Sequence, residues 1–317
     1  MKTLISIVFH SDLDKLKSTI ISIEKSEAGG TIVVLDASRD SIAFTALNHS
    51  TAIVIKNPRN GGFSWGHHQV FAQFGSDADV FVCANPDVTF TPSSLQTLIR
   101  HASENEGLYY PVQLTEHGEP ATYSVHPTIS LRDSAARWTG VGRKRRSREV
   151  LAAVSRTYGS RCVVRISPNL CGSGAVIAMR ASTWRTTGGL STDFFLFSED
   201  REFGHRAAVA GVQSFLCGDA LVIHPGGFRM QGVTAKGSCE SVVSEQIYWS
   251  KWVDHPVFAL ITLQIIGIGA RLIWATIRRD HRKIQTWRAV FKYRIWKMRL
   301  EPAAPRLADG FRRGVDL

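Results

Sequence analysis

The chain has 317 residues, of which 44% are hydrophobic, and it carries a formal net charge of +11. This composition excludes an intrinsically disordered protein, and the length can bury the core of one large domain or two smaller ones. The five cysteines include no CxxC pair, which argues against a disulfide framework and against a cysteine-based zinc site. A protein of a reducing compartment fits these observations best.

Residues 1–110 alternate short apolar runs with amphipathic segments. The apolar runs predict strands at Thr3–Phe9, Thr31–Leu35, Ala52–Ile55 and Val80–Cys83. The amphipathic segments predict helices at Leu13–Glu24, Ser64–Phe74 and Ser93–His101. Strands spaced by helices indicate an α/β fold, with a mostly parallel sheet that is covered by helices on both faces. Ligands of such sheets bind at the carboxyl ends of the strands, so polar residues there are candidate site residues.

The middle of the chain is less periodic. Residues 111–165 are predicted as an irregular excursion over the sheet edge, and residues 171–227 as short strands with one helix. Within the excursion, the basic run Arg143–Arg146 fits either a solvated face or a loop that faces phosphate.

Positive charge is concentrated at the C-terminal end. Residues 271–317 contain 13 Lys and Arg against 4 Asp and Glu, a net of +9, so the rest of the chain is nearly neutral. The asymmetry indicates an anionic partner, either a membrane surface or a nucleic acid. This segment has no recognisable nucleic-acid-binding motif, which favours the membrane surface.

Two helices are predicted near this end. Residues Val257–Ala270 hold no charge, but at about 1.5 Å per residue they reach only roughly 21 Å, less than the roughly 30 Å of a hydrocarbon core. A helix that lies in the membrane interface is therefore expected. The alternative is a pair of helices packed on the body of the protein. The second helix is basic and amphipathic, and its apolar residues recur at helical spacing: Ile284, Trp287, Phe291, Ile295 and Met298.

Polar residues follow several of the predicted strands. Asp36 follows the second strand, with Ser38 close by, and an acid there can accept hydrogen bonds from a base or a ribose, or simply cap a turn. Asn85 and Asp87 follow the fourth strand, where an amide oxygen and a carboxylate can approach a divalent metal on a diphosphate. The alternative there is a plain Asn-Pro turn. His224 ends a later apolar run and is either a buried structural residue or a metal ligand.

Two further segments stand at the start of predicted helices. Asn60–Gly62 forms a glycine turn, which lets a phosphate or sugar approach helix N-terminal amides, although a bare turn is the alternative. Glu199 and Asp200 follow Ser198 in a helix-start pattern. Acids at this position stabilise the helix dipole, or they act as a general base at a cleft.

These motifs occur in one order along the chain: a strand followed by Asp, Asn-x-Gly-Phe-x-x-Gly, Asn-Pro-Asp, Gly-Ser-Gly-Ala, Gly-Gly-x-x-x-x-Phe-Phe-Leu-x-x-Glu-Asp, and a late His. In this order they resemble the inverting family 2 glycosyltransferases with a GT-A fold. The closest resemblance is to the bacterial rhamnosyltransferase-like branch that acts on cell-envelope polysaccharides. It covers roughly residues 3–230, and the Asn-Pro-Asp and Phe-Phe-Leu-x-x-Glu-Asp motifs are its most specific parts.

The resemblance implies a Rossmann-like sheet and a role for each marked residue. Asp36 would bind a uracil or thymine nucleoside, with Ser38 beside it. Asp87 would hold Mg²⁺ or Mn²⁺ on the diphosphate, and His224 would be a further contact to the metal or the diphosphate. Asp200 would be the general base, with Glu199 beside it. The donor pocket would include four further residues: Asn60, Gly61, Gly62 and Asn85. His67 and His68 replace the more usual Gly-Asn or Asn-Asn, which predicts an effect on sugar choice.

We therefore expect a GT-A catalytic domain over residues 1–250 and a basic, membrane-associating helical region over residues 251–317. The expected reaction is the inverting transfer of a sugar, with L-rhamnose as first candidate, from a dTDP- or UDP-sugar to a lipid-linked glycan. This reaction would serve cell-envelope polysaccharide synthesis at the cytoplasmic face of the bacterial inner membrane, with the protein peripheral or interfacial. No nucleic acid is expected as a partner. Cutting the chain after about His255 should then release a soluble body.

Three alternatives remain at this point. The first is transfer of another sugar, such as galactofuranose or N-acetylglucosamine. The second is a non-catalytic membrane scaffold, and the third is a nucleic-acid-binding protein, which the basic composition would suit.

Overall fold

The computed structural model describes residues 1–38, 40–47, 50–57, 60–140, 143–225 and 235–299, with only the backbone for 143–149 and 296–299. The chain forms two compact units. The sheet unit comprises residues 1–128, 147–192 and 199–227, and the helical unit comprises residues 129–146, 193–198 and 228–317. The boundary expected at residue 250 falls inside the helical unit, although the functional division at that point stays a prediction.

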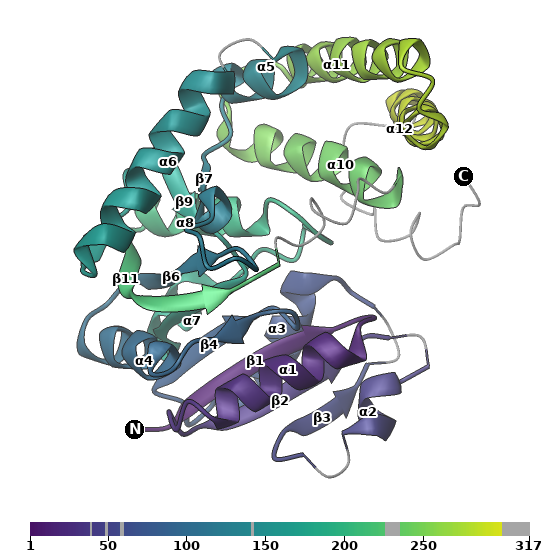
Figure 1. Cartoon of the computed structure of the whole chain (residues 1–317). Coiled ribbons are helices and arrows are strands. Elements are labelled where there is room, and N and C mark those ends of the chain that lie inside the picture. The colour runs from purple at the N-terminus through teal and green to yellow at the C-terminus, as the bar shows by residue number, and fades with distance from the viewer. Residues whose placement is uncertain (39, 48–49, 58–59, 141–142, 226–234, 300–317) are drawn as a thin grey trace. The chain divides into compact units, whose positions relative to one another are not determined.

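Among the described residues, nine strands form the main sheet of the sheet unit (Figure 1). Their order is β3-β2-β1-β4-β10-β6-β11-β5, with β8 paired to β11. Strands β1 to β4 run parallel, β6 runs parallel to β11, and β10 lies antiparallel between β4 and β6. A smaller sheet pairs β7 with β9. The bounds are β1 Thr3–Phe9, β2 Thr31–Asp36, β3 Ile53–Lys56, β4 Val80–Ala84, β5 Thr89–Phe90, β6 Leu108–Leu114, β7 Val125–Pro127, β8 Val163–Arg165, β9 Leu170–Gly172, β10 Val176–Arg180 and β11 Ser214–Ile223.

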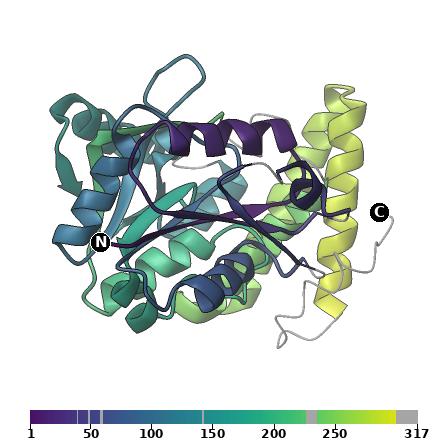
Figure 2. The same ribbon diagram turned by 90° about the horizontal axis from the view of Figure 1, so that it is seen from below.

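Helices cover both faces of the main sheet, as is usual for a mostly parallel sheet. Helices α1 and α4 contribute Leu16, Ile20 and Leu98 to the core on one face. Helices α3, α6, α7 and α8 contribute to the core on the other face, and Figure 2 shows α1 and α3 on opposite sides of β1. The bounds are α1 Leu13–Glu24, α2 Ile42–Ala46, α3 Phe63–Phe74, α4 Ser94–Glu104, the 3-10 helix η1 Thr122–Ser124, α6 Arg143–Ser160, α7 Ala181–Thr187 and α8 Glu199–Val209.

The structure confirms the α/β fold with a mostly parallel sheet. The strands and helices predicted for the first 110 residues are all present, with ends that agree within three residues. Helix α1 begins as the sequence indicates, because the Asp12 side chain accepts a hydrogen bond from the Lys15 amide at 3.2 Å and caps the helix. All five cysteines are free, as expected from their spacing.

Two predictions for the middle of the chain are wrong. Residues 111–165 are not an irregular excursion, because they include helix α5 (Leu131–Thr139) and the long helix α6. Helix α6 buries Val150, Val154 and Thr157 at helical spacing, a period that the charged residues before it obscure. The basic run Arg143–Arg146 is therefore helical rather than a loop, and its side chains lie outside the described residues. Of the segment 171–227, predicted to hold one helix, the described residues 171–225 hold two, α7 and α8.

In its described part, the helical unit contains α5, α10 (Ala235–Trp252), α11 (Val257–Ile277) and α12 (His281–Arg299). It has a hydrophobic core of its own, to which α5 contributes Trp138 and α10 contributes Val242 and Trp249. Helix α11 adds Leu260 and Ile268 to this core. The two C-terminal helices are thus packed against other helices of this unit. This agrees in part with the alternative stated above, a pair of packed helices.

Helix α11 continues through Arg271, the charged residue that directly follows the uncharged run Val257–Ala270. The Arg271 guanidinium donates hydrogen bonds to the backbone oxygens of Arg137, Trp138 and Gly267, so its charge is held by protein. Within the described residues, α11 alone has the length and apolar character to cross a membrane, and 22% of its most apolar 18-residue window is buried. Core helices of soluble proteins also meet this criterion.

Helix α12 has the predicted amphipathic pattern with one correction. Ile284, Trp287, Phe291 and Ile295 are half-buried, whereas the Met298 side chain lies outside the described residues. Arg294, expected on the basic face, is almost fully buried, and its Nη1 donates to Gln246 Oε1 at 3.0 Å. Burial lowers the pKa of Arg294 to about 10, although nearby Tyr293 and Glu245 oppose this effect.

Candidate active site

The polar residues singled out in the sequence gather at one edge of the main sheet. Asp36 is the last residue of β2, Asp87 follows β4, and His224 follows β11. These strands run in the same direction, so their carboxyl ends meet at this edge. The antiparallel strand β10 begins there, directly after Gly174 and Ala175. The edge therefore has the position in which open α/β sheets bind their ligands.

The Asp36 carboxylate organises the loop that follows β2. It is fully buried, and Oδ1 accepts hydrogen bonds from the amide and the hydroxyl of Ser38. Its other oxygen, Oδ2, accepts from the Phe44 amide at 3.0 Å, and Ser38 Oγ accepts from the Ile42 amide. Both residues thus shape the loop at the sheet edge, and a contact to a nucleoside stays a prediction.

The Asn60–Gly62 turn is built to start helix α3. Asn60 Oδ1 accepts a hydrogen bond from the Gly62 amide at 3.1 Å, and Gly62 has a φ of 94°, which favours glycine. A Cβ on Gly61 would lie only 2.5 Å from the Trp65 ring. Each of the three residues therefore has a structural role in the turn. The first backbone amides of α3 come directly after the turn in the chain. A turn of this kind suits an anionic group.

Asp87 and His224 face each other across the sheet edge. His224 Nε2 lies 3.3 Å from Asp87 Oδ1, and its other nitrogen, Nδ1, donates to Gln113 Oε1 at 2.7 Å. Gln113 belongs to β6, the strand next to β11, and is almost fully buried. The Gln113 contact accepts the Nδ1 hydrogen in either form of the ring. When the ring is charged, Nε2 also donates to Asp87, and when it is neutral, Nε2 carries the lone pair that a metal could bind.

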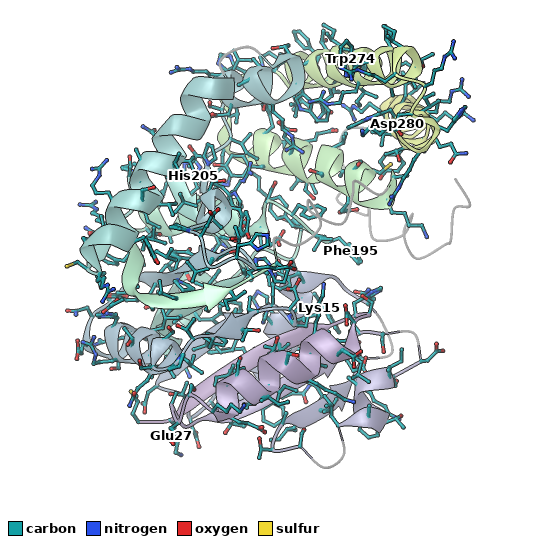
Figure 3. The ribbon with its side chains drawn as sticks, viewed as in Figure 1. Lys15, Glu27, Phe195, His205, Trp274 and Asp280 are labelled. Atoms are coloured by element: carbon teal, nitrogen blue, oxygen red, sulfur yellow. The ribbon has the colours of Figure 1, made fainter. Side chains whose placement is uncertain are left out.

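The Asp87 carboxyl is held in its charged form. Burial alone raises the pKa of Asp87, but the hydrogen bond and charge of a protonated His224 outweigh it, together with the charge of Lys15 on α1 (Figure 3). The pKa of Asp87 therefore lies below its usual value. The backbone of Asn85, two residues earlier, is fixed because its backbone N–H donates to the Ala175 backbone oxygen at 2.8 Å.

Asp200 lies at the first turn of α8 and is held by backbone amides. Its Oδ2 accepts from the Gly174 amide at 3.0 Å, and its Oδ1 accepts from the Arg201 amide at 2.8 Å. A Cβ on Gly174 would lie 3.1 Å from Asp200 Cβ, so glycine allows this close approach. Glu199 is buried beside it. Because Gly174 directly precedes the Ala175 carbonyl that binds Asn85, one short segment links the Asp200 and Asn85 positions.

The backbone before α8 is strained. Phe197 and Ser198 adopt positive φ values of 71° and 64°, in the region that non-glycine residues rarely occupy. Each such residue costs on the order of 1 kcal/mol or more, and strain of this kind tends to occur at functional sites. Helix α8 begins at Glu199, as the Ser-x-x pattern predicted.

A family model described as glycosyl transferase family 2 matches residues 7–171, more than half of the chain. The chain belongs to glycosyl transferase family 2. The matched segment includes Asp36 and Asp87 and ends before Asp200 and His224. No curated protein matches the chain.

Solved glycosyltransferases share the fold of this family 2 enzyme. The mannosyltransferase PcManGT from Pyrobaculum calidifontis, in complex with GDP-Man and Mn²⁺, has a TM-score of 0.54 at 12% identity, over 93% of this chain and 85% of that one. GalNAc-T7, with UDP, GalNAc and Mn²⁺, has a TM-score of 0.51 at 14% identity, over 70% of this chain. The matched part spans only 43% of the GalNAc-T7 chain. At these identities the likeness shows the fold, and the predicted GT-A architecture is confirmed.

Three residues of the candidate site were missed by sequence reasoning. Gln113 holds His224, and the Tyr123 hydroxyl donates to the His224 backbone oxygen at 2.7 Å. His126 on β7 has its Nε2 3.9 Å from Asp200 Oδ2. Only Gln113 leaves a signal in the sequence, as a polar residue inside the apolar run of β6. Its partner is set by the β6–β11 pairing, which the sequence does not display.

The paired histidines of α3 are turned into the protein. His67 is fully buried, with Nδ1 2.7 Å from Ser6 Oγ, and burial with the charge of His68 lowers its pKa to about 3. His68 Nε2 lies 2.8 Å from the Leu190 oxygen, and its ring packs near Trp184. Their described contacts are structural, and an influence of these residues on sugar choice stays a prediction.

The Asp87–His224 pair fits a divalent metal that is shared with a phosphate ligand. A carboxylate oxygen and an imidazole lone pair are both suitable ligands for Mn²⁺, and carboxylates suit Mg²⁺. Nucleotide-bound metals typically take one or two protein ligands and complete their coordination with phosphate oxygens and water. Two protein ligands at the carboxyl edge are therefore sufficient for such an ion.

Proposed function

We propose that this family 2 glycosyltransferase transfers L-rhamnose from dTDP-L-rhamnose to a lipid-linked glycan, with inversion at the anomeric carbon. The observation that carries the proposal is the pairing of Asp87 with a His224 whose Nδ1 is held by Gln113, at the same sheet edge as Asp200. The alternatives for the sugar are galactofuranose and N-acetylglucosamine. The two structural neighbours were solved with other ligands, UDP and GalNAc in one and GDP-Man in the other, so the corresponding sugar nucleotides belong in any test.

The donor is proposed to lie along the carboxyl edge of the sheet. The loop that Asp36 and Ser38 hold together would take the nucleoside. The α3 turn would take the sugar diphosphate beside the first helix amides, through Asn60, Gly61 and Gly62. Asn85 would line the pocket next to Asp87. Each of these residues is fixed by a backbone contact, which favours a preorganised donor site.

Asp87 and His224 are proposed to hold Mg²⁺ or Mn²⁺ on the donor diphosphate. Such an ion neutralises the charge that develops on the leaving nucleoside diphosphate. The chain's own contribution is the Asp87 carboxylate and a His224 ring that Gln113 orients so that Nε2 faces this carboxylate. The Mn²⁺ named with both structural neighbours supports this choice of cofactor.

Asp200 is proposed as the general base. As the acceptor hydroxyl attacks the anomeric carbon, its proton passes to the Asp200 carboxylate. The amides of Gly174 and Arg201 bind the carboxylate in a fixed orientation without neutralising it. A single base and a single displacement give inversion, because no enzyme nucleophile takes part. Glu199, buried beside Asp200, is assigned a supporting role.

The acceptor and the location are proposed together. An apolar helix α11 and the exposed basic residues of α12 suit a protein at an anionic membrane surface. A lipid-linked glycan at the cytoplasmic face of the bacterial inner membrane would place the acceptor at that surface. No nucleic-acid partner is proposed.

The experiment for the donor is a panel of sugar nucleotides. Purified full-length protein is incubated with dTDP-rhamnose, UDP-galactofuranose, UDP-GlcNAc, UDP-GalNAc and GDP-mannose, with Mn²⁺ or with excess chelator, and nucleoside diphosphate release is measured. The proposal expects release from dTDP-rhamnose that needs the metal. Release from another donor corrects the sugar, and no release from any donor contradicts the assignment of a donor site at this edge.

The experiment for the base compares Asp200→Asn with Glu199→Gln. Asp200→Asn should keep donor binding and lose roughly 10²- to 10⁴-fold in turnover, because an amide cannot take the proton. Glu199→Gln should be the milder change. If the order of the two variants is reversed, Glu199 is the base and Asp200 is the supporting residue.

A further inference from the structure

Helix α11 exposes one continuous apolar stripe. Five of the thirteen large apolar side chains that are exposed in the described part of the chain belong to this helix, and each is more than half exposed. With Thr262 and Ala270 they follow one helical face at spacings of three and four residues. The stripe consists of Phe258, Thr262, Ile266, Ala270, Ile273, Trp274 and Ile277.

The opposite side of α11 is the more polar one. Gln264 is fully buried and donates to the Val242 oxygen on α10 at 3.0 Å. Arg271 donates to backbone oxygens of α5, and its guanidinium lies 5.0 Å from the Trp138 ring and 5.4 Å from the Trp287 ring. Helix α11 is thus apolar on both sides, since Leu260 and Ile268 face the core, but its outer side is apolar where a surface helix of a soluble protein is polar.

The polar groups on the outer side are already satisfied within the helix. Thr262 Oγ1 donates to the Phe258 oxygen at 2.9 Å, and Thr276 Oγ1 donates to the Leu272 oxygen at 2.9 Å. In hydrocarbon, every polar group must find a partner inside the protein, and these hydroxyls meet that condition.

We infer that α11 lies in the plane of a membrane, with this stripe in the acyl region of one leaflet, and does not cross the bilayer. The inference rests on the membrane association proposed above and specifies its geometry. The stripe requires an apolar partner. The residue types at the C-terminal end of α11 favour lipid as this partner. Trp274 lies at this end (Figure 3), and the Arg278 guanidinium is 4.7 Å from its ring. Trp and Arg side by side are typical of the boundary between acyl chains and headgroups.

Anionic lipids fit the charges that follow. Arg278, Arg279, Arg282 and Lys283 are all exposed directly after the stripe. Lysine and arginine near an anionic surface each add to binding, while the apolar stripe adds insertion. A second copy of the chain that paired with α11 in parallel would bring four cations against four cations at this end, which is unfavourable.

The packing of the helical unit argues against a spanning orientation. Helix α11 packs against α5, α10 and α12 in one core, and Figure 1 shows α11 lengthwise and α12 nearly end-on, so the two helices cross. A spanning α11 would carry its neighbours into hydrocarbon, including the Arg137–Glu245 ion pair and the exposed Arg288 and Lys292 of α12. Charges at that depth are costly, and an in-plane helix avoids this burial.

The test uses a fluorophore whose emission depends on polarity, NBD, at single cysteines in the full-length chain. Cys162→Ser removes the one exposed native thiol, since the other four cysteines are buried. Labels are placed on the stripe at Phe258→Cys, Ile266→Cys and Ile277→Cys. Val209→Cys, on an exposed apolar position of α8, is the matched control. The proteins are added to sealed vesicles of phosphatidylcholine and phosphatidylglycerol, and unlabelled protein is checked for unchanged melting.

The in-plane geometry predicts one result for all three stripe labels. Each should shift to shorter wavelength and gain intensity, be quenched by lipids that carry a quencher at one acyl depth, and lose its emission when dithionite is added outside. The Val209 label should keep its aqueous emission. A second measurement is vesicle flotation. The double variant Ile266→Asp with Ile273→Asp should no longer float with the vesicles, whereas Val209→Asp should still do so.

Other outcomes overturn the inference in distinguishable ways. A deep label at position 266 with one helix end protected from dithionite means that α11 crosses the bilayer. Flotation without any change of the stripe labels places the membrane contact elsewhere, and the membrane association stands. No flotation rejects that association as well, and a concentration-dependent shift without lipid identifies a second copy as the occupant. None of these results bears on the sugar-nucleotide panel.

Discussion

The Gln113 side chain decides which nitrogen of His224 faces Asp87. Its Oε1 accepts the Nδ1 proton at 2.7 Å inside a fully packed strand, so the imidazole ring cannot turn without leaving Gln113 unpaired. Such partners behind a metal-binding histidine are typically worth about 10- to 100-fold in metal affinity. In the proposed metal site, Gln113 is thus a positioning residue, which would act on the metal only through His224.

We predict that Gln113→Met raises the Mn²⁺ concentration for half-maximal donor turnover about 10- to 100-fold. Turnover at saturating Mn²⁺ should recover, because the ligands themselves remain. Gln113→Glu is the matched control, since a carboxylate also accepts the Nδ1 proton and should restore most of the affinity. An unchanged Mn²⁺ dependence in Gln113→Met would show that His224 does not need this partner.

His67 makes the stability of the sheet unit depend on pH. Its pKa is about 3 in the folded protein and about 6.5 when unfolded, so between these values the unfolded chain binds a proton that the folded chain does not. The free energy of unfolding should therefore fall as the pH drops below about 6.5. From pH 7 to pH 5 the loss from this one residue is about 2 kcal/mol.

Urea unfolding at pH 7 and pH 5 measures this contribution. His67→Gln should be less stable than the wild type at pH 7, because the Ser6 contact is weakened, but should lose about 2 kcal/mol less between the two pH values. The exposed His117, changed to Gln, is the control and should follow the wild type. The same loss in His67→Gln and wild type would exclude His67 as the source.

At the scale of the element, glycine sets the distance between α3 and β1. A Cβ on Gly66 would lie 2.5 Å from a methyl group of Val8, a branched side chain that is stiff about its Cα–Cβ bond. Gly66 is also the last glycine of the Asn-x-Gly-Phe-x-x-Gly motif. The motif therefore combines the turn at Asn60–Gly62 with close packing of the helix on the sheet.

Gly66→Ala should destabilise the protein by about 1–3 kcal/mol through overpacking. The matched control is Gly159→Ala in α6, where an added Cβ meets nothing within 4 Å. That change should stabilise by about 0.5–1 kcal/mol through helix propensity. Denaturant midpoints of both variants test the pair. A Gly66→Ala midpoint at or above the wild-type value would mean that α3 does not approach β1 this closely.

The elements that the sequence predicted well are those with one clear period. The strands and helices of the first 110 residues show such a period. The position of Asp36 and Asp87 after predicted strands was enough to identify both as candidate site residues. Helix α6 was missed because its charged first half obscures the apolar spacing of Val150 and Val154. Helix α10 was missed for a related reason, since it buries acids such as Glu245, which accepts from Trp138 Nε1.

The arrangement of the site required more than local patterns. Gln113 and His224 are 111 residues apart and meet only because β6 pairs with β11. His126 approaches Asp200 through the small β7–β9 sheet, which no sequence signal marked. Residue types at strand ends can be read along a chain, whereas strand order and register depend on packing over the whole sheet.

At the scale of the whole molecule, the C-terminal helices belong to a folded unit and are not a detachable tail. Leu260, Ile268 and Val290 complete a core with Trp249 of α10. Cutting the chain after about His255 therefore removes part of this core, and the expectation that a soluble body would be released does not follow from this packing.

We predict that the protein ending at His255 aggregates, because the apolar residues of α5 and α10 lose their cover. Light scattering and size-exclusion chromatography of detergent-free preparations measure this outcome. A chain that ends after Arg299 keeps every described element and is the control, which should remain dispersed under conditions that suit the full-length protein. A monodisperse His255 truncation would show that α5 and α10 are stable without α11 and α12.

The measurement that tests the central claim most directly is Mn²⁺ binding by electron paramagnetic resonance in the presence of dTDP or UDP. The account predicts one bound Mn²⁺ in the wild type, which is lost in both Asp87→Ala and His224→Ala while the melting temperature of each stays near that of the wild type. Asp200→Asn should bind Mn²⁺ as the wild type does, because the base is not a ligand. Undiminished Mn²⁺ binding in both Asp87→Ala and His224→Ala would contradict the assignment of this pair as the metal site.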